Sequence, residues 1–141
     1  MTDTCVDSGP GGRILIVDDE REYVMVLAKR LGKRGFQVTT TFGGAEGIQA
    51  LRRTDFDVAL VDLKMEDMNG LEVLGVFKKM APETAVIMLT GHGSAEAAKD
   101  GMRMGAFDYL SKPCELDQLI VKIKQAMGRQ EPQKAEKKDS A

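Results

Sequence analysis

The chain has 141 residues, of which 43% are hydrophobic and 30% charged, and its formal net charge at pH 7 is −2. This composition predicts one globular domain with a core of its own, and the small net charge gives no support to nucleic-acid binding by general electrostatics. No apolar stretch approaches the roughly 18 residues of a membrane span, and residues 1–12 lack the features of a secretion signal, so we expect a cytoplasmic protein with neither membrane nor nucleic acid as partner.

Both ends of the chain are expected to lie outside the folded domain. Residues 1–12 are rich in small and polar residues and predict a flexible tail. Residues 129–141 contain no large apolar residue and predict a disordered polar tail or a linker. The predicted domain therefore spans residues 13–128.

The first half of this domain predicts strand, helix, strand and helix in turn. An apolar run over 13–17 indicates a strand, and a helix with apolar residues on one face follows from near Glu20 until Gly35 stops it. Residues 36–41 alternate and are rich in β-branched side chains, which favours a strand. A short helix over 45–52 completes this half.

The middle of the domain continues the alternation. Residues 56–61 form an apolar run typical of a buried strand. A helix with apolar residues from Leu71 onward follows and ends near Pro82. Residues 85–89 are a second apolar run and predict the fourth strand.

The last part of the domain predicts one weak helix and one strong one. Residues 94–104 carry only small or unbranched apolar side chains, so this helix should be held loosely on the sheet. A strand over 107–110 follows. Residues 116–127 show the cleanest amphipathic helical pattern in the chain.

Five strand–helix pairs in succession indicate an α/β fold with a parallel sheet covered on both faces. Right-handed crossovers leave few topologies for such a chain. We therefore predict a (βα)5 doubly wound five-stranded parallel sheet in the order 2-1-3-4-5, a flavodoxin-like fold. In this order the first and third strands are neighbours.

Four of the predicted strands end in polar side chains. Asp18 and Asp19 follow the first strand, Asp62 follows the third, Thr90 the fourth and Lys112 the fifth. Because parallel strands end at the same edge of a sheet, these side chains should gather where open α/β sheets bind ligands. Taken singly, each has an ordinary alternative: helix capping for the first two, a turn for the threonine and a solvated charge for the lysine. The four strand ends together favour a functional site.

Three carboxylates at this edge would require a cation. Two like charges about 4 Å apart repel each other by roughly 4 kcal/mol at an effective dielectric constant near 20. Oxygen ligands that are open to solvent suit Mg²⁺, whereas a single histidine serves transition metals poorly. Among the acids, Asp62 is the best candidate for a nucleophile that attacks phosphorus. Lys112 and Thr90 would supply a positive charge and a hydrogen bond to the phosphoryl group.

Several motifs occur in a characteristic order and spacing. They are Val-Asp-Asp-Glu at 17–20, Val-Asp-Leu-Lys-Met at 61–65, Met-Asn-Gly at 68–70, Leu-Thr-Gly at 89–91 and Gly-Ala-Phe-Asp-Tyr-Leu-Ser-Lys-Pro at 105–113. On these motifs the chain resembles, over about residues 12–128, the CheY-like receiver domain of two-component response regulators.

The resemblance implies a phosphorylation-dependent switch rather than an enzyme that acts on other molecules. Asp62 would accept phosphate from a sensor histidine kinase or a phosphotransfer protein, and the domain would assist only its own phosphotransfer and dephosphorylation. The metal ligands would be Asp19, Asp62 and the backbone carbonyl of Lys64, with Asp18 acting through water. Lys112 would contact the phosphoryl group and form a cis peptide with the proline that follows it.

The resemblance also implies how the signal is read. Thr90 would move toward the phosphoryl group and Tyr109 would turn inward behind it. This movement would alter the face made by residues 94–104, 107–110 and 116–127. The expected users of that face are a fused or separate output domain and a second copy of the chain in a homodimer.

Three positions suggest properties of this particular chain. Glu66 stands where the family usually has proline, which predicts altered metal affinity or a more mobile loop. Lys64 and His92 lie two residues beyond the acceptor and the threonine, and we hypothesise that they tune hydrolysis of the phosphorylated protein. The alternative for both is an ordinary exposed loop side chain.

Three other functions remain to be distinguished by experiment. A flavodoxin-like binder of nucleotide or flavin needs a phosphate-cradling loop after the first strand, whereas here acids stand there and Gly9, Gly11 and Gly12 precede the strand. A Mg²⁺-dependent hydrolase with an aspartyl nucleophile would carry a second acid where Lys64 stands. A phosphate-blind receiver used only for docking is disfavoured by the complete set of site residues.

Overall fold

Strands and helices alternate throughout residues 11–91 and 95–128, which are the residues that the structure, a computed structural model, describes. The strands are β1 (Arg13–Val17), β2 (Gln37–Thr41), β3 (Val58–Asp62), β4 (Ala85–Thr90) and β5 (Asp108–Ser111). The helices are α2 (Arg21–Lys33), α3 (Gly44–Arg53), α4 (Gly70–Met80), α5 (Ala95–Arg103) and α6 (Leu116–Gly128). Element boundaries differ from the predicted ones by at most two residues, and β1 coincides with its predicted range.

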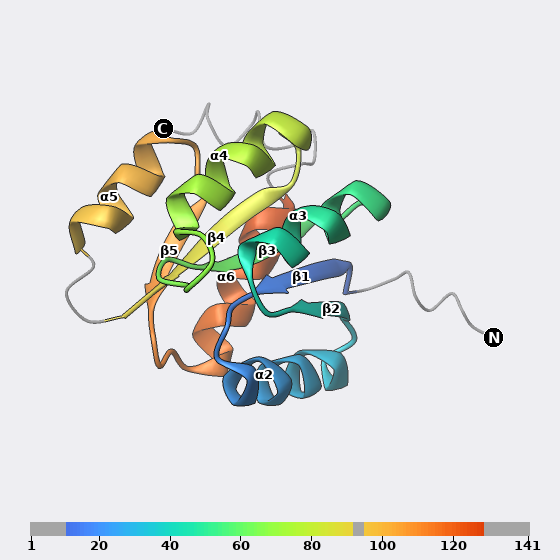
Figure 1. Cartoon of the computed structure of the whole chain (residues 1–141). Coiled ribbons are helices and arrows are strands. Elements are labelled where there is room, and N and C mark those ends of the chain that lie inside the picture. The colour runs from blue at the N-terminus through green and yellow to red at the C-terminus, as the bar shows by residue number, and fades with distance from the viewer. Residues whose placement is uncertain (1–10, 92–94, 129–141) are drawn as a thin grey trace, which may run out of the picture.

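All five strands form a single parallel sheet in the order β2-β1-β3-β4-β5 (Figure 1). The predicted doubly wound, flavodoxin-like fold is thereby confirmed. Strand β1 pairs with both β2 and β3, so that Val17 lies opposite Thr41 on one side and Val61 on the other. The residues that follow β1 and those that end β3 are consequently neighbours at one edge of the sheet.

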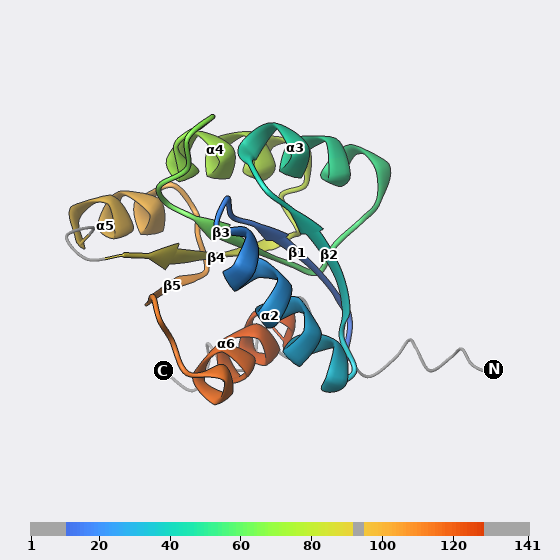
Figure 2. The same ribbon diagram turned by 60° about the horizontal axis from the view of Figure 1, so that its bottom comes forward.

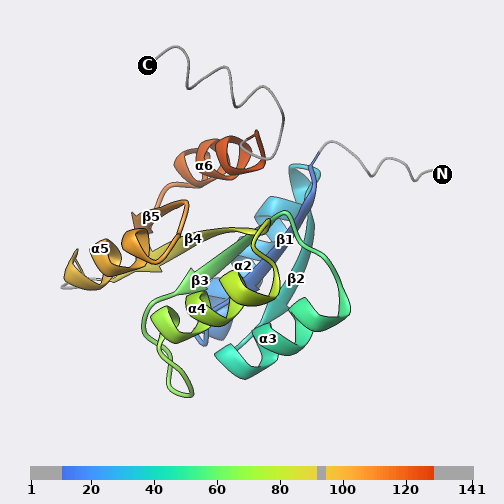
Figure 3. The same ribbon diagram turned by 90° about the horizontal axis from the view of Figure 1, so that it is seen from above.

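Helices cover both faces of the sheet, with α2 and α6 on one face and α3, α4 and α5 on the other (Figures 2 and 3). Successive residues of a strand point to opposite faces. Ile14 and Ile16 of β1 therefore pack with α2 and α6, whereas Leu15 and Val17 pack with α3 and α4. Every residue of β3 is buried, as expected for a central parallel strand.

Helix α5 has a smaller apolar contact with the sheet than its neighbour α4. Its buried residues are only Ala98 and Gly101, whereas α4 buries the larger side chains of Val73, Leu74 and Phe77. This agrees with the weak apolar pattern of the sequence. Because less apolar area holds α5 in place, we expect it to be displaced more easily than α4.

The predicted tails fall largely outside the described residues, which begin at residue 11 and end at residue 128. Gly11 and Gly12, which the sequence placed in the N-terminal tail, belong to the packed structure. Gly11 is buried, and a Cβ atom on it would lie 2.2 Å from the carbonyl oxygen of Gly35. Gln37 N–H donates to the Gly12 carbonyl at 2.9 Å. Within the described residues, no helix is long and apolar enough to cross a bilayer.

Candidate functional site

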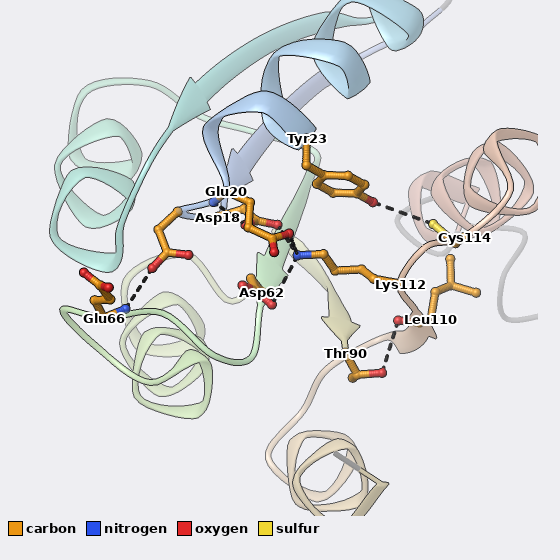
Figure 4. Close-up of polar contacts among 10 residues, drawn as sticks. Asp18, Glu20, Tyr23, Asp62, Glu66, Thr90, Leu110, Lys112 and Cys114 are labelled. Carbon is orange, nitrogen blue, oxygen red and sulfur yellow. Dashed lines mark hydrogen bonds and ion pairs between the residues drawn. The ribbon is translucent and has the colours of Figure 1, made fainter. Parts of the chain in front are cut away.

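The carboxyl ends of four strands bring the predicted site residues together (Figure 4). Asp62 is the last residue of β3. Asp18 follows β1, and its backbone N–H donates to the Thr41 carbonyl at 3.2 Å. Lys112 follows β5, and its backbone N–H donates to the Thr90 carbonyl at 2.7 Å. These backbone hydrogen bonds continue the parallel pairing past the strands and so fix where each side chain begins.

Asp18, Asp19 and Asp62 form a carboxylate cluster in which one oxygen of each lies within 4.8 Å of the others. Asp18 is fully buried, and Asp62 is 6% exposed. Burial and the nearby Asp18 charge raise the pKa of Asp62 from 3.8 to about 6, although Lys112 partly offsets them. Burial likewise raises the pKa of Asp18. The folded protein therefore carries like charges at a free-energy cost that a bound cation would relieve.

Lys112 is the cation that faces this cluster. Its Nζ atom lies 2.9 Å from Oδ2 of Asp18, 2.7 Å from Oε1 of Glu20 and 3.7 Å from Oδ1 of Asp62. Burial by itself lowers the pKa of the Lys112 ammonium, but the hydrogen bonds to Glu20 and Asp18 more than compensate and raise it. Lys112 therefore remains charged at the edge of the site.

Tyr23 lines the site beside Lys112. Its ring centroid is 4.7 Å from the Lys112 Nζ, within cation–π range, and its hydroxyl lies 3.9 Å from the Cys114 Sγ. The site opens into a cleft of about 490 Å³ lined by Glu20, Tyr23, Asp62, Lys64, Gly91, Lys112 and Pro113. A cleft of this volume has room for an anion of phosphate size, and Asp62 is one of the residues that line it.

Thr90 and Tyr109, the predicted switch residues, lie on the neighbouring strands β4 and β5. Thr90 is buried, and its hydroxyl donates to the Leu110 carbonyl at 3.4 Å, away from Asp62 (Figure 4). Tyr109 is 42% exposed. The Thr90 hydroxyl thus contacts the backbone of the strand that carries Tyr109, which links the two positions physically.

Comparison with known proteins supports the same fold. The family model of the response regulator receiver domain matches residues 14–124. This chain is a member of that family. The resemblance seen in the sequence motifs is thereby confirmed, and the domain is a receiver of a two-component system.

Curated relatives of this receiver include transcriptional regulators. GlrR of Escherichia coli K12, a transcriptional regulatory protein, is 35% identical over 119 residues, which are 84% of this chain and 27% of that protein. RegA of Cereibacter sphaeroides, a photosynthetic apparatus regulatory protein, is 36% identical over 117 residues, which are 83% of this chain and 64% of that protein. The chain thus spans about a quarter of GlrR and less than two thirds of RegA.

Solved receiver structures agree with the fold. The crystal structure of a response regulator receiver domain protein from Clostridium thermocellum superposes with a TM-score of 0.80 at 35% identity. The alignment covers 83% of this chain and 94% of that one. NtrX from Brucella abortus, solved in complex with ADP, gives a TM-score of 0.82 at 29% identity, covering 93% of this chain and 30% of that one.

The loop after Asp62 in this receiver is anchored at two successive residues. The backbone N–H of Glu66 donates to Oδ2 of Asp19 at 2.9 Å. The Asp67 carboxylate accepts hydrogen bonds from the backbone N–H groups of Gly44 and Ala45, both at 3.0 Å, and these bonds lower its pKa. The position that usually holds proline therefore uses its N–H group on a site carboxylate, which proline could not do.

Helix α4 of this receiver begins directly against the backbone of Asp62. Asn69 caps the helix, because its Oδ1 accepts from Leu71 N–H at 2.7 Å in a capping box with Glu72. A Cβ atom on Gly70 would lie 2.4 Å from the Asp62 carbonyl oxygen. Only glycine at this position allows the helix to start so close to Asp62.

The sequence motifs alone did not assign a role to every residue of this site. Glu20 and Tyr23 contact Lys112, and their spacing of three residues at the start of a helix was the available signal, since it places both on one face. Lys64 has an exposed side chain, and its backbone N–H forms a hydrogen bond with the Asp62 carboxylate. His92 lies outside the described residues. The peptide bond between Lys112 and Pro113 is cis, as the resemblance implied.

Proposed function

We propose that Asp62 of this receiver takes up a phosphoryl group from the phosphohistidine of a sensor kinase or phosphotransfer protein. The observation that carries this proposal is the position of its carboxylate, which lines the cleft and lies among Asp18, Asp19 and Lys112. In the transfer, a carboxylate oxygen forms a bond to phosphorus, the bond between phosphorus and the imidazole nitrogen breaks, and its electron pair stays on that nitrogen. Lys112 stabilises the negative charge that arrives with the phosphoryl oxygens.

The carboxylate cluster fits Mg²⁺. Oxygen atoms of three acids within 4.8 Å of one another, in an open cleft, match the preference of this ion for few carboxylates and retained water. Asp19, Asp62 and the Lys64 carbonyl would hold it directly, and Asp18 would hold it through water. When bound, Mg²⁺ neutralises the acids and the phosphoryl oxygens. Hydrolysis would be tuned by Lys64 and His92, as hypothesised from the sequence.

Replacing Glu66 with proline should weaken Mg²⁺ binding by about tenfold, as the loss of an outer partner of a metal ligand commonly does. Proline has no N–H to orient the Asp19 carboxylate, which Glu66 N–H contacts at 2.9 Å. Glu66→Gln keeps that N–H and removes only the side-chain charge, so its affinity should change much less. Titration calorimetry with MgCl₂ compares the three proteins. Equal affinities of the proline variant and the parent would show that the contact does not support metal binding.

The signal would pass through Thr90 to the surface of α5, β5 and α6. On phosphorylation the Thr90 hydroxyl leaves the Leu110 carbonyl and turns to the phosphoryl group, and Tyr109 moves inward. Displacing α5 is inexpensive because Ala98 and Gly101 are its only buried residues. Phosphorylation then shifts an existing equilibrium, and a fused or separate output domain or a second receiver reads the changed surface.

Intact-mass measurement tests the proposed function. After incubation with acetyl phosphate and Mg²⁺, the protein should gain the mass of one phosphoryl group, and EDTA should suppress that gain. Asp62→Asn should show no gain under the same conditions. A folded, Mg²⁺-binding protein without any gain from phosphorylated donors would instead indicate a docking receiver. A yellow colour or a retained nucleotide in the pure protein would favour the flavin or nucleotide binder.

A further inference from the structure

Lys112 contacts two other carboxylates more closely than it contacts Asp62. Its Nζ lies 2.7 Å from Glu20 and 2.9 Å from Asp18, but 3.7 Å from Asp62 (Figure 4). An ammonium has three N–H donors, and acids other than the proposed acceptor lie within hydrogen-bond distance of two of them. A phosphoryl group on Asp62 has only the third donor to itself, and any further contact with Lys112 must replace one of these acids.

The two competing acids differ in how firmly they are held. Asp18 is fully buried, and its other oxygen accepts the Glu20 backbone N–H at 2.9 Å. The Glu20 side chain is 61% exposed, so solvent can replace Lys112 as its partner at little cost. Glu20 is thus the contact that Lys112 can exchange.

Glu20 occupies a position from which a side chain commonly caps a helix. It is the N-cap residue of α2, yet its side chain makes no capping hydrogen bond to the helix. Its carboxylate instead contacts the Lys112 ammonium. Tyr23 contacts the same segment twice, because its ring lies against the Lys112 ammonium and its hydroxyl lies near the Cys114 Sγ. The start of α2 therefore holds the Lys112 ammonium through Glu20 and Tyr23, with its Nζ 3.7 Å from Asp62.

We propose that Glu20 is a positioning residue that holds the Lys112 ammonium in an unphosphorylated position and competes with the phosphoryl group for it. The Tyr23 ring forms the other wall of this position. This inference rests on the function proposed above and concerns how readily the site is phosphorylated. Because Glu20 is exposed, we expect it to change the rate of phosphorylation moderately rather than to turn phosphorylation on or off.

Glu20→Gln tests this proposal, because it removes the charge and keeps the size of the side chain. We expect the initial rate of phosphoryl uptake from acetyl phosphate to rise about two- to fivefold, the range that an exposed ion pair supports. Glu22→Gln is the matched control, since it makes the same charge change on the exposed first turn of α2. Its rate should stay near that of the parent.

A second measurement reads the position of Lys112 without any phosphorylation. The side-chain ¹⁵N and ¹H resonances of Lys112 should shift in Glu20→Gln and not in Glu22→Gln, in the unphosphorylated protein. A shift and a rate increase confined to Glu20→Gln support the proposal. Identical behaviour of the two variants would overturn it. If no protein takes up a phosphoryl group, the proposed function fails, and the Lys112 resonances alone still decide whether Glu20 positions the ammonium.

Discussion

Replacing Asp62 with asparagine should make the Mg²⁺-free protein more stable at pH 7 while abolishing phosphoryl uptake. In the folded protein, burial and the neighbouring Asp18 raise the pKa of Asp62 from 3.8 to about 6. Such an increase corresponds to a cost of up to about 3 kcal/mol when the group is ionised. Asparagine carries no charge, so this cost disappears together with the nucleophile.

The pH dependence of this effect has a definite sign. A group whose pKa is raised on folding favours the folded state below its unfolded pKa and loses that contribution as pH rises through the folded value. The stability of the parent relative to Asp62→Asn should therefore fall between about pH 4 and pH 6 and level off above. Urea denaturation across this range measures the difference, with the exposed Asp55→Asn as control. Saturating Mg²⁺ should raise the stability of the parent more than that of Asp62→Asn. A pH-independent difference would mean that Asp62 ionises normally.

Replacing Lys112 with alanine should have the opposite effect and destabilise the protein at pH 7. The substitution leaves the fully buried Asp18 without the cation that now lies 2.9 Å from it. Removing one partner of a buried ion pair typically costs about 3–5 kcal/mol, and we expect about 2–3 kcal/mol because the cleft is open. The loss should be largest without Mg²⁺, which would otherwise supply a positive charge.

Acid should reduce the cost of the Lys112→Ala substitution. Burial raises the pKa of Asp18 and of Asp62, and the Lys112 charge now opposes that increase. Without the lysine both acids take up protons at higher pH, and the neutral acids no longer need a partner. Urea denaturation at pH 5 and pH 7 measures this. Lys124→Ala removes an exposed lysine of α6 and should change stability by less than about 0.5 kcal/mol. An equal loss at both pH values would show that lost packing, rather than charge, is the cause.

The sheet and the location of the site could be predicted from the sequence because both depend on strand order. Apolar runs that end in acids, and alternating helices, leave few parallel topologies, and β1 beside β3 then places Asp18 near Asp62. Local patterns also identified α5 as the weakly held helix. These inferences need only the direction and sequence of strands, which hydrophobic patterns encode strongly.

The contact of Lys112 with Glu20 could not be predicted because it depends on how distant loops approach each other. Glu20 reads in the sequence as the residue that opens a helix, and its spacing from Tyr23 indicates a shared helix face but not a contact with a lysine that follows β5. The orientation of Thr90 toward Leu110 depends on a side-chain rotamer. Glu66 was interpreted as a missing proline, whereas the structure shows its N–H bound to Asp19. A hydrogen bond made by a backbone N–H group cannot be predicted from the type of side chain at that position.

Helix α3 obtains its N-terminal cap from the loop that follows Asp62. Gly43 has no side chain with which to cap it, and the Asp67 carboxylate bonds to the first two N–H groups of the helix instead. Movement of this loop away from α3 would leave those groups without partners, whereas movement of α5 gives up only the contacts of small residues such as Ala98 and Gly101. The α3 side of the site is therefore more rigid than the α5 side. A structural change that begins at Asp62 should consequently spread toward α5.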